Sequence, residues 1–304
     1  MSRLADKVAL ITGGARGQGR AMALKFAAEG ADIVISDACA PMPTVPYELS
    51  TAEDLEQTRA RVESLGRRCL AVEADVRSLS EMTSVGAQAV EAFGRIDILC
   101  ASAGVHSFAH FWEMPSEMWQ QVIDINLTGV FNSAKAVVGP MMEQRSGVII
   151  ATSSVMGRET GPDLAHYAAS KHGVLGIVKS LAFELGPYGI RANALLPSVV
   201  HDKMGDNPAT REWVFKREGA TTDDYVAATR HWHALRGRAA LPAAAVADAA
   251  LWLASDEAMH ISGVELVIDA GHSILPGFNH EPIVDDEIAV GPYHDDGVVL
   301  PQQV

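Results

Sequence analysis

The sequence predicts one doubly wound α/β domain, in which a seven-stranded parallel sheet carries helices on both faces. Short apolar runs alternate with segments of helical spacing from the first residues to about residue 275. Most of these runs are continuously apolar, which is typical of parallel strands covered on both faces. No internal repeat or interdomain linker breaks the alternation, so one domain over residues 1–275 is the simplest organisation.

The strands are expected where short runs are rich in aliphatic and β-branched residues: 7–12, 31–36, 68–73, 96–101, 148–153, 191–195 and 264–269. Helical spacing lies between them, over residues 17–30, 51–66, 79–93, 117–139 and 163–185, and a further helix precedes the last strand. Thr51 is a suitable N-cap for the second helix, and Gly66 stands just past its end.

Three segments depart from this rhythm. Residues 38–50 carry three prolines directly after the second strand, and residues 201–241 form a long aromatic and charged stretch after the sixth. Connections of that length in a compact domain are usually functional, and the second is expected to be a partly helical lid over a substrate. Residues 276–304 hold six acids and four prolines without Lys or Arg, which predicts an irregular C-terminal extension.

Composition excludes several classes of protein. A formal net charge of −14 argues against a nucleic-acid or anionic-membrane surface. No apolar run reaches the roughly 18 residues of a membrane span, and the N-terminus lacks the pattern of a signal peptide. Cys39, Cys69 and Cys100 have no metal-ligand spacing, so we expect reduced thiols, no metal site and a cytoplasmic location.

A glycine-rich turn, Thr12–Gly19 (TGGARGQG), lies where the first strand ends and the first helix begins. Glycines at this place let backbone N–H groups and the helix N-terminus approach a pyrophosphate without obstruction by a Cβ atom. The predicted contacts come from five residues of the turn: Gly13, Arg16, Gly17, Gln18 and Gly19.

Two carboxylates are placed to contact the adenosine half of a dinucleotide. Asp37 follows the second strand, where it can accept both ribose hydroxyls and repel a 2′-phosphate. Ala38 comes next, so no adjacent base would receive that phosphate, although Arg16 could reach it; NAD is favoured over NADP. Asp75, followed by Val76, could accept a hydrogen bond from the adenine amino group or, alternatively, cap the next helix.

The chemistry is expected from Tyr167, Lys171 and Ser154. Four residues make about one helical turn, so Tyr167 and Lys171 share a face of the same helix. A phenol with a reference pKa of ~10 is a poor base at neutral pH, and a neighbouring ammonium favours its ionised form. Ser154, after the fifth strand, can hydrogen-bond the same substrate oxygen, and it lacks the G-x-S-x-G elbow of an acyl-transfer nucleophile.

These motifs together resemble the short-chain dehydrogenase/reductase family, with its Rossmann fold, over about residues 4–275. The matching positions are Thr12–Gly19, Asp37, Asp75, Ala103, Gly104, Asn126, Ser154, Tyr167 and Lys171. The resemblance implies that nicotinamide accepts hydride while Tyr167 takes the alcohol proton, that Ser154 orients the substrate oxygen, and that Lys171 holds the nicotinamide ribose. Asn126 would hold a water linking Lys171 to solvent, or tie neighbouring strands together; the two roles are compatible. Ala103 and Gly104 would also contact the cofactor.

A narrower resemblance joins the segment VPYELSTAEDLEQT, and the later segments ALWLASDEA and GVELVIDAG, to the carveol-dehydrogenase-like branch of that family. This branch is linked to the peptide-derived redox carrier mycofactocin, and its members are thought to hold NAD without releasing it. The resemblance implies that the insertion 38–50 traps the cofactor and that mycofactocin reoxidises it. Alternatively, the insertion is a surface loop.

Two positions depart from the family pattern. Ser102 stands where the family has Asn in its Asn-Ala-Gly motif, which puts the usual backbone-bridging contact in question. After the sixth strand, Pro197 and Val200 match the family's nicotinamide-binding segment, but Asp202 replaces the threonine expected to contact the carboxamide.

The substrate is expected over the nicotinamide, walled by His106, Val155, Met156 and the lid 201–241. Met and Trp in these walls favour an apolar secondary alcohol, including a cyclic, terpene-like one. His106 and His166 are interpreted as hydrogen-bonding or packing residues. Family resemblance implies a homotetramer in which the helices that carry Asn126 and Tyr167 pack between subunits. The rival hypotheses are an exchanging, NADP-linked ketone reductase and a non-catalytic NAD sensor.

Overall fold

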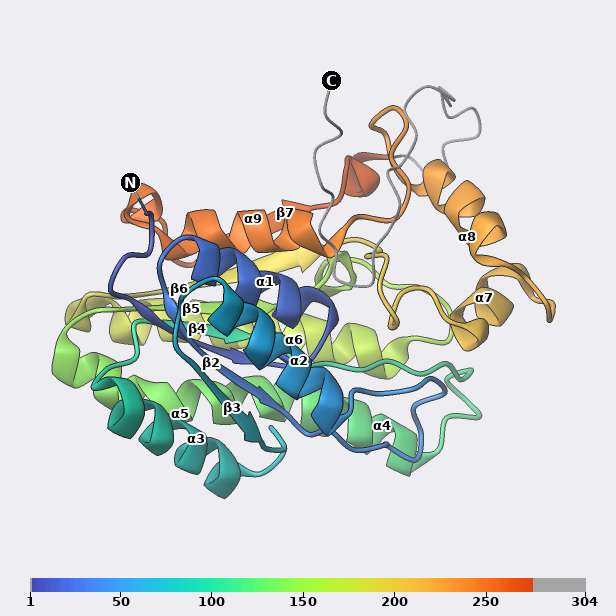
Figure 1. The fold of residues 1–304 in the computed structure, drawn as a ribbon. Helices are drawn as coiled ribbons and strands as arrows, with labels where there is room; N and C mark the ends of the chain where they lie inside the picture. The colour runs from blue at the N-terminus through green and yellow to red at the C-terminus, as the bar shows by residue number, and fades with distance from the viewer. Residues whose placement is uncertain (1, 276–304) are drawn as a thin grey trace.

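Seven strands form one parallel sheet in the order β3-β2-β1-β4-β5-β6-β7 in the computed structural model, which describes residues 2–275 (Figure 1). The strands are β1 (Val8–Thr12), β2 (Asp32–Asp37), β3 (Cys69–Glu73), β4 (Ile98–Ala101), β5 (Gly147–Thr152), β6 (Ile190–Pro197) and β7 (Glu265–Ile268). The strand order reverses between β1 and β4, and in such sheets ligands bind at the carboxyl ends of the strands beside that point. The predicted fold class is confirmed.

The α-helices within residues 2–275 are α1 (Gly17–Ala28), α2 (Ala52–Ser64), α3 (Leu79–Phe93), α4 (Ser116–Ile123), α5 (Gly129–Gln144), α6 (Ala165–Leu185), α7 (Pro208–Phe215), α8 (Thr222–Thr229) and α9 (Ala243–Ala254). In Figure 1, α1 and α9 lie on one side of the sheet and α3 and α5 on the other. Thr51 caps α2 through a capping box with Asp54, and Gly66 follows its end with φ +77°, both as predicted.

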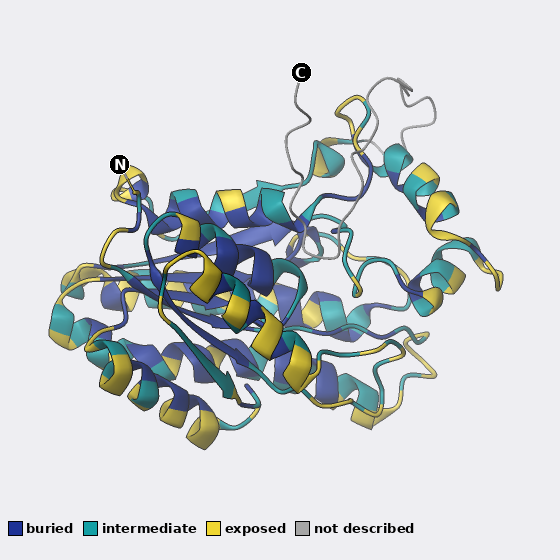
Figure 2. Ribbon diagram, viewed as in Figure 1, coloured by how far each residue is buried: buried dark blue, intermediate teal, exposed yellow. Residues whose placement is uncertain are grey.

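Alternate residues of each strand enter two separate cores. Ile11 and Ile33 pack with α1, α2 and α9 on one face, whereas Leu10 and Val34 pack with α3, α5 and α6 on the other. The central strands therefore show dark blue through the middle of the molecule, whereas the edge strands β3 and β7 are mostly of intermediate burial (Figure 2). This two-sided burial explains why the central strands read as unbroken apolar runs.

The structure corrects two expected boundaries near the site. The helix predicted over residues 117–139 extends from Ser116 to Gln144, and residues Asp124–Thr128 within it adopt π-helical hydrogen bonding. Strand β5 ends at Thr152, so Ser154 does not end the strand but begins the 3₁₀ turn Val155–Gly157. π-Helical segments frequently occur at functional sites, and this one contains Asn126.

The lid predicted over residues 201–241 is partly helical, with α7, α8 and the 3₁₀ turn Arg230–Trp232. Figure 1 shows α7 and α8 standing away from the helices that cover the sheet. No helix among residues 2–275 is long and apolar enough to cross a membrane. The predicted extension 276–304 lies outside the described residues.

Candidate active site

Two adjoining cavities open at the carboxyl ends of the strands. The first, about 260 Å³, is lined by Gly13, by the segment 16–20, by the end of β2 and by the loops after β3 and β4; we call it the glycine-loop cavity. The second, about 480 Å³, is lined by Ser154, Tyr167, Lys171 and the lid, and we call it the Tyr167 cavity. Their contact brings the predicted cofactor turn and the predicted catalytic residues to one place.

The glycine-rich turn is packed too closely for side chains at its glycines. Gly13 has φ +69°, and a Cβ atom there would lie 2.8 Å from the Cα of Ala103. A Cβ atom on Gly19 would lie 2.1 Å from the carbonyl oxygen of Gly13. The turn therefore presents backbone to the cavity beside the start of α1, the arrangement that a pyrophosphate requires.

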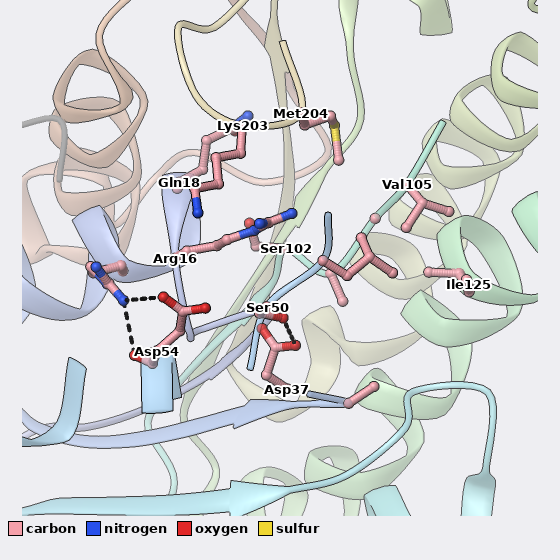
Figure 3. Close-up of a pocket in the computed structure, with 18 of the residues that line it drawn as sticks. Arg16, Gln18, Asp37, Ser50, Asp54, Ser102, Val105, Ile125, Lys203 and Met204 are labelled. Atoms are coloured by element: carbon pink, nitrogen blue, oxygen red, sulfur yellow. Dashed lines mark hydrogen bonds and ion pairs between the residues drawn. The ribbon is translucent and has the colours of Figure 1, made fainter. Parts of the chain in front are cut away.

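Polar atoms around this turn fit the dinucleotide that the fold implies. Arg16 Nη1 and Gln18 Oε1 are buried without a hydrogen-bond partner among the described residues. The N-terminus of α1 also receives no side-chain cap within that part of the chain. Both side chains project into the glycine-loop cavity in Figure 3, so the cradle retains donors and acceptors for a polar, anionic ligand.

Asp37 lies at the end of β2 on the wall of the same cavity. One carboxylate oxygen accepts the backbone N–H of Ala15 at 3.2 Å, and the other accepts the Ser50 hydroxyl at 2.5 Å (Figure 3). Arg16 Nη2 donates to the carbonyl oxygen of Glu48 at 2.6 Å, in the insertion. The Asp37 carboxylate therefore lies where the adenosine half of the dinucleotide is predicted to bind. One guanidinium nitrogen of Arg16 is already hydrogen-bonded to the insertion.

Asp75 and Val76, predicted to contact the cofactor, also line the glycine-loop cavity. Asp75 accepts hydrogen bonds from the backbone and guanidinium of Arg77, at 2.9 and 2.8 Å. The alternative role as a helix cap is wrong, because the Ser78 side chain caps α3.

The insertion 38–50 forms one wall of the glycine-loop cavity through Ala38, Ala40, Met42, Tyr47, Leu49 and Ser50. It is held from below by α4, where Gln121 Oε1 accepts the backbone N–H of Thr44 at 3.1 Å and also its hydroxyl. The Tyr47 hydroxyl accepts the backbone N–H of His106 at 3.1 Å. The insertion is therefore held to two neighbouring segments through residues near its middle.

Tyr167 and Lys171 face the Tyr167 cavity from one side of α6. Burial raises the pKa of Tyr167 to about 12, an effect partly offset by a hydrogen bond with Ser154 and strengthened by the charge of Asp202. Burial lowers the pKa of Lys171 to about 8. Its Nζ donates to the carbonyl oxygen of Thr152 at 2.8 Å and lies 5.5 Å from the centre of the Tyr167 ring.

Asn126 is fully buried behind this pair. Its side-chain amide exchanges two hydrogen bonds of 2.9 Å with the backbone of Val105 and donates a third to Ser170 at 3.2 Å. A Cβ atom on Gly104 would lie 3.4 Å from Asn126 Oδ1 and 3.6 Å from Lys171 Nζ. Asn126 thus ties the loop after β4 to α6 and stands close to the Lys171 ammonium.

The wall of the Tyr167 cavity is mainly apolar and aromatic. His106, Val155, Met156 and residues of the lid line it, as expected. The Phe108 and Trp213 rings stack there with centroids 4.7 Å apart and an angle of 12°. His166 lines neither the glycine-loop cavity nor the Tyr167 cavity. It is buried, and its Nε2 is hydrogen-bonded to the Ser107 hydroxyl at 2.8 Å.

The departures from the family pattern have definite structural outcomes. The Thr12 hydroxyl accepts the backbone N–H groups of Ser102 and Ala103, at 3.2 and 3.4 Å, so β1 and β4 are bridged without Asn at position 102. Pro197 and Val200, predicted to contact the cofactor, line the Tyr167 cavity and not the glycine-loop cavity. Asp202 lines both cavities.

Sequence reasoning missed Tyr47 and Gln121 as site residues. The insertion was predicted to approach the cofactor, but no spacing in the sequence connects Thr44 with Gln121, 77 positions away. Within residues 2–275, no group of three or more His, Cys, Asp or Glu side chains could hold a metal ion.

Residues 7–213 match the family model described as short chain dehydrogenase. The chain is 40% identical to (-)-trans-carveol dehydrogenase of Rhodococcus erythropolis over 280 residues, which cover 90% of this chain and all of that one. Among solved structures, carveol dehydrogenase from Mycobacterium avium in complex with NAD is similar with a TM-score of 0.88 and 40% identity, over 90% of this chain and 100% of that chain. A short chain dehydrogenase from Mycobacterium paratuberculosis bound to NAD has a TM-score of 0.81 and 35% identity, with coverage of 90% and 100%.

The likeness extends from the fold to the arrangement of the site. The glycine-rich turn, the buried Asn126 and the trio of Ser154, Tyr167 and Lys171 occupy one edge of the sheet around two joined cavities. The matched family model begins one residue before β1 and ends in α7, so it includes all of these residues. The chain belongs to the short-chain dehydrogenase family.

Proposed function

We propose that the protein is an NAD-linked oxidoreductase that interconverts an apolar secondary alcohol and its ketone. The observation that carries the proposal is the junction of the two cavities. A cradle suited to a dinucleotide adjoins an apolar chamber that contains Tyr167, Lys171 and Ser154. The names of similar proteins, which include a carveol dehydrogenase, favour a cyclic, terpene-like alcohol as substrate.

NAD would lie along the glycine-loop cavity with its nicotinamide end at the Tyr167 cavity. The residues inferred to hold it are Gly13, Arg16, Gly17, Gln18, Gly19, Asp37, Asp75, Val76, Ala103, Gly104, Tyr167, Lys171, Pro197 and Val200. Asp37 would accept the adenosine ribose hydroxyls and exclude a 2′-phosphate by charge repulsion. When bound, NAD supplies the acceptor for the hydride that leaves the alcohol carbon.

Tyr167 would take the proton of the alcohol hydroxyl. Because the pKa of this phenol is raised to about 12, chiefly by burial, the reaction needs a positive charge that favours the phenolate. The Lys171 ammonium, 5.5 Å from the ring centre, provides it. Ser154 would donate its hydroxyl to the substrate oxygen and fix its position between the two groups.

Asn126 would support this proton transfer by holding a water next to Lys171. Its carbonyl oxygen and the Lys171 ammonium both face Gly104, so a water held between them would carry the proton from Lys171 toward solvent. The amide's bonds to Val105 serve the structural role as well.

We further propose that the insertion 38–50 retains NAD between turnovers and that mycofactocin accepts its electrons. Support comes from the three contacts that hold the insertion on its neighbours, Thr44 with Gln121, Tyr47 with His106 and Arg16 with Glu48. A cofactor enclosed in this way would leave only when these contacts open together.

The test mixes the protein, as purified, with a panel of apolar secondary alcohols and no added nucleotide. We expect the near-ultraviolet absorbance of reduced nicotinamide to appear in a single turnover, and an artificial electron acceptor to restore turnover. The variant Tyr167→Phe should retain its NAD and show no reduction, whereas Tyr188→Phe, in the 3₁₀ turn Gly186–Tyr188 that follows α6, should react normally. Reduction by Tyr167→Phe would contradict the mechanism.

The rival hypotheses give different results in the same assay. An exchanging NADP-linked ketone reductase would be silent until NADPH and a ketone were added. A non-catalytic NAD sensor would bind nucleotide without reduction by any alcohol or oxidation by any ketone.

The assembly that we propose is a cytoplasmic homotetramer. Phe131 on α5 and Phe183 on α6 are 47% and 87% exposed, on the two helices that the resemblance places between subunits. A contiguous exposed apolar patch marks an interaction site, and we propose that Phe131 and Phe183 belong to one that a neighbouring subunit covers.

A further inference from the structure

Five residues line both cavities: Gln18, Ser102, Gly104, Asp202 and Met204. They mark the place where the two spaces meet. A dinucleotide in the glycine-loop cavity can approach Tyr167 only through this junction, so its reactive ring must lie beside these residues. Asp202 is the one acid among the five.

The Asp202 carboxylate is held in a fixed orientation. Oδ1 accepts the backbone N–H groups of Met204 at 3.0 Å and Gly205 at 2.8 Å. Oδ2 points toward the start of α1, because a Cβ atom on Gly17 would lie 3.1 Å from it. The carboxylate therefore faces the junction from the lid side, opposite the glycine-rich turn.

The charge of Asp202 acts on groups across the junction. Burial raises the pKa of Asp202, while the two N–H groups, Arg16 and His201 favour its ionised form. Its negative charge in turn raises the pKa of both Tyr47 and Tyr167. Since charges interact more strongly away from bulk water, this carboxylate contributes to the electrostatic environment of the reaction centre.

We propose that Asp202 lowers the reduction potential of the nicotinamide bound at this junction. The oxidised ring carries a positive charge and the reduced ring does not, so a carboxylate beside the ring stabilises NAD⁺ over NADH. Alcohol oxidation on the protein becomes less favourable, and transfer of electrons from the bound NADH to a later acceptor becomes more favourable. The inference rests on NAD binding in the proposed function, but not on the substrate or on mycofactocin.

A different result is expected if the negative charge of Asp202 acts on another part of the cofactor. If Asp202 acts mainly on the pyrophosphate beside Gly17, it repels the oxidised and the reduced cofactor equally. The reduction potential then does not depend on Asp202, and only the overall affinity does.

The experiment compares the wild type with Asp202→Asn, which keeps an oxygen for the Met204 and Gly205 N–H groups and removes the charge. Protein loaded with NAD(H) is equilibrated anaerobically with a dye couple of known potential, and the reduced fraction is read from nicotinamide absorbance. We expect the potential to rise in the variant by about 30 mV, which corresponds to an approximately tenfold change in the ratio of NADH to NAD⁺ affinity.

The matched control is Asp223→Asn, which makes the same chemical change at an exposed position of α8 that lines neither cavity. It should leave the potential unchanged. If Asp202→Asn does not fold, Asp202→Thr removes the same charge and should shift the potential in the same direction. An unchanged potential in a folded, neutral variant overturns the proposal. A protein that binds neither NAD⁺ nor NADH contradicts it together with the cofactor assignment, whereas a failure to oxidise alcohols leaves this measurement intact.

Discussion

Individual side chains of the site are governed by the balance between burial and charge. Burial moves the pKa of Tyr167 up to about 12 and that of Lys171 down to about 8, and both shifts oppose the charged forms. The charged forms of the two groups therefore depend on each other. An ammonium at Lys171 favours a phenolate at Tyr167, and a phenolate at Tyr167 favours the ammonium at Lys171. Asp202 works against the phenolate, since its charge raises the pKa of Tyr167 further.

Asp37 should determine the choice between NAD and NADP. The variant Asp37→Ala removes the negative charge at the end of β2 and the proposed ribose acceptor, so NAD⁺ affinity should fall and discrimination against NADP⁺ should decrease at least tenfold, or about 1.4 kcal/mol. The measurement is the ratio of the two dissociation constants by calorimetry. Asp75→Asn, at the adenine end of the cavity, should weaken both cofactors alike and leave that ratio unaltered. An unaltered ratio in Asp37→Ala would refute the assignment.

His106 should make stability depend on acidity. Burial lowers the pKa of His106 to about 4, with a smaller contribution from His166. Below pH 6.5 the unfolded chain binds a proton that the folded chain binds only near pH 4, so stability falls as pH drops through this window. Because the ring borders a cavity, we expect about 1–2 kcal/mol, less than its full shift would imply.

The measurement is denaturant unfolding of wild type and His106→Asn between pH 4 and 7. The variant should show a weaker pH dependence. His260→Asn, at an exposed position, is the control. Parallel pH profiles for wild type and His106→Asn would contradict the expectation.

Among the elements, the insertion and the lid carry the specific features of the site. The insertion is anchored to α4 through Gln121, and the lid is anchored beside it because His106 Nε2 lies 3.3 Å from the Thr210 hydroxyl of α7. His106 also contacts the Tyr47 ring edge to face, with centroids 5.3 Å apart. The insertion and the lid therefore both contact the side chain of His106.

Loss of the Gln121 contact should speed the release of NAD. Gln121→Ala removes two hydrogen bonds that hold Thr44, each worth about 1 kcal/mol, so the dissociation rate should rise on the order of tenfold. Stopped-flow displacement with excess labelled cofactor measures it. Gln120→Ala is the matched control, because the Gln120 side chain donates to Asp124 Oδ1 on the same helical segment at 2.7 Å. A release rate equal to that of the wild type would argue that the insertion does not retain NAD.

The elements differ in how far their sequence determines them. Strand and helix order followed from apolar patterning, and the pairing of Tyr167 with Lys171 followed from helical spacing, because both depend on local geometry. The π-helical turn around Asn126 has no local signal in DINLT, since it depends on how the segment packs between α4 and α5. The contacts of Thr44 with Gln121, and of Asp202 with both cavities, arise from loops distant in sequence and required the fold.

At the scale of the whole molecule, the exposed phenylalanines of α5 and α6 should lie in subunit contacts. Phe183→Glu places a charge in the proposed contact and should shift the protein from tetramer to smaller species in analytical ultracentrifugation. Leu65→Glu alters a leucine that is 46% exposed after α2 and should leave the assembly intact. A tetramer in Phe183→Glu, or a monomer in the wild type, would contradict the proposed assembly.

We propose that the intact protein carries NAD that it does not release between turnovers. The most direct measurement is native mass spectrometry of protein purified without added nucleotide, followed by denaturation and identification of whatever is released. We predict nearly one NAD(H) per chain, without NADP(H). Nucleotide-free chains that take up and exchange NAD within seconds would contradict a retained cofactor and indicate an ordinary alcohol dehydrogenase; recovery of NADP(H) would contradict the assignment of Asp37.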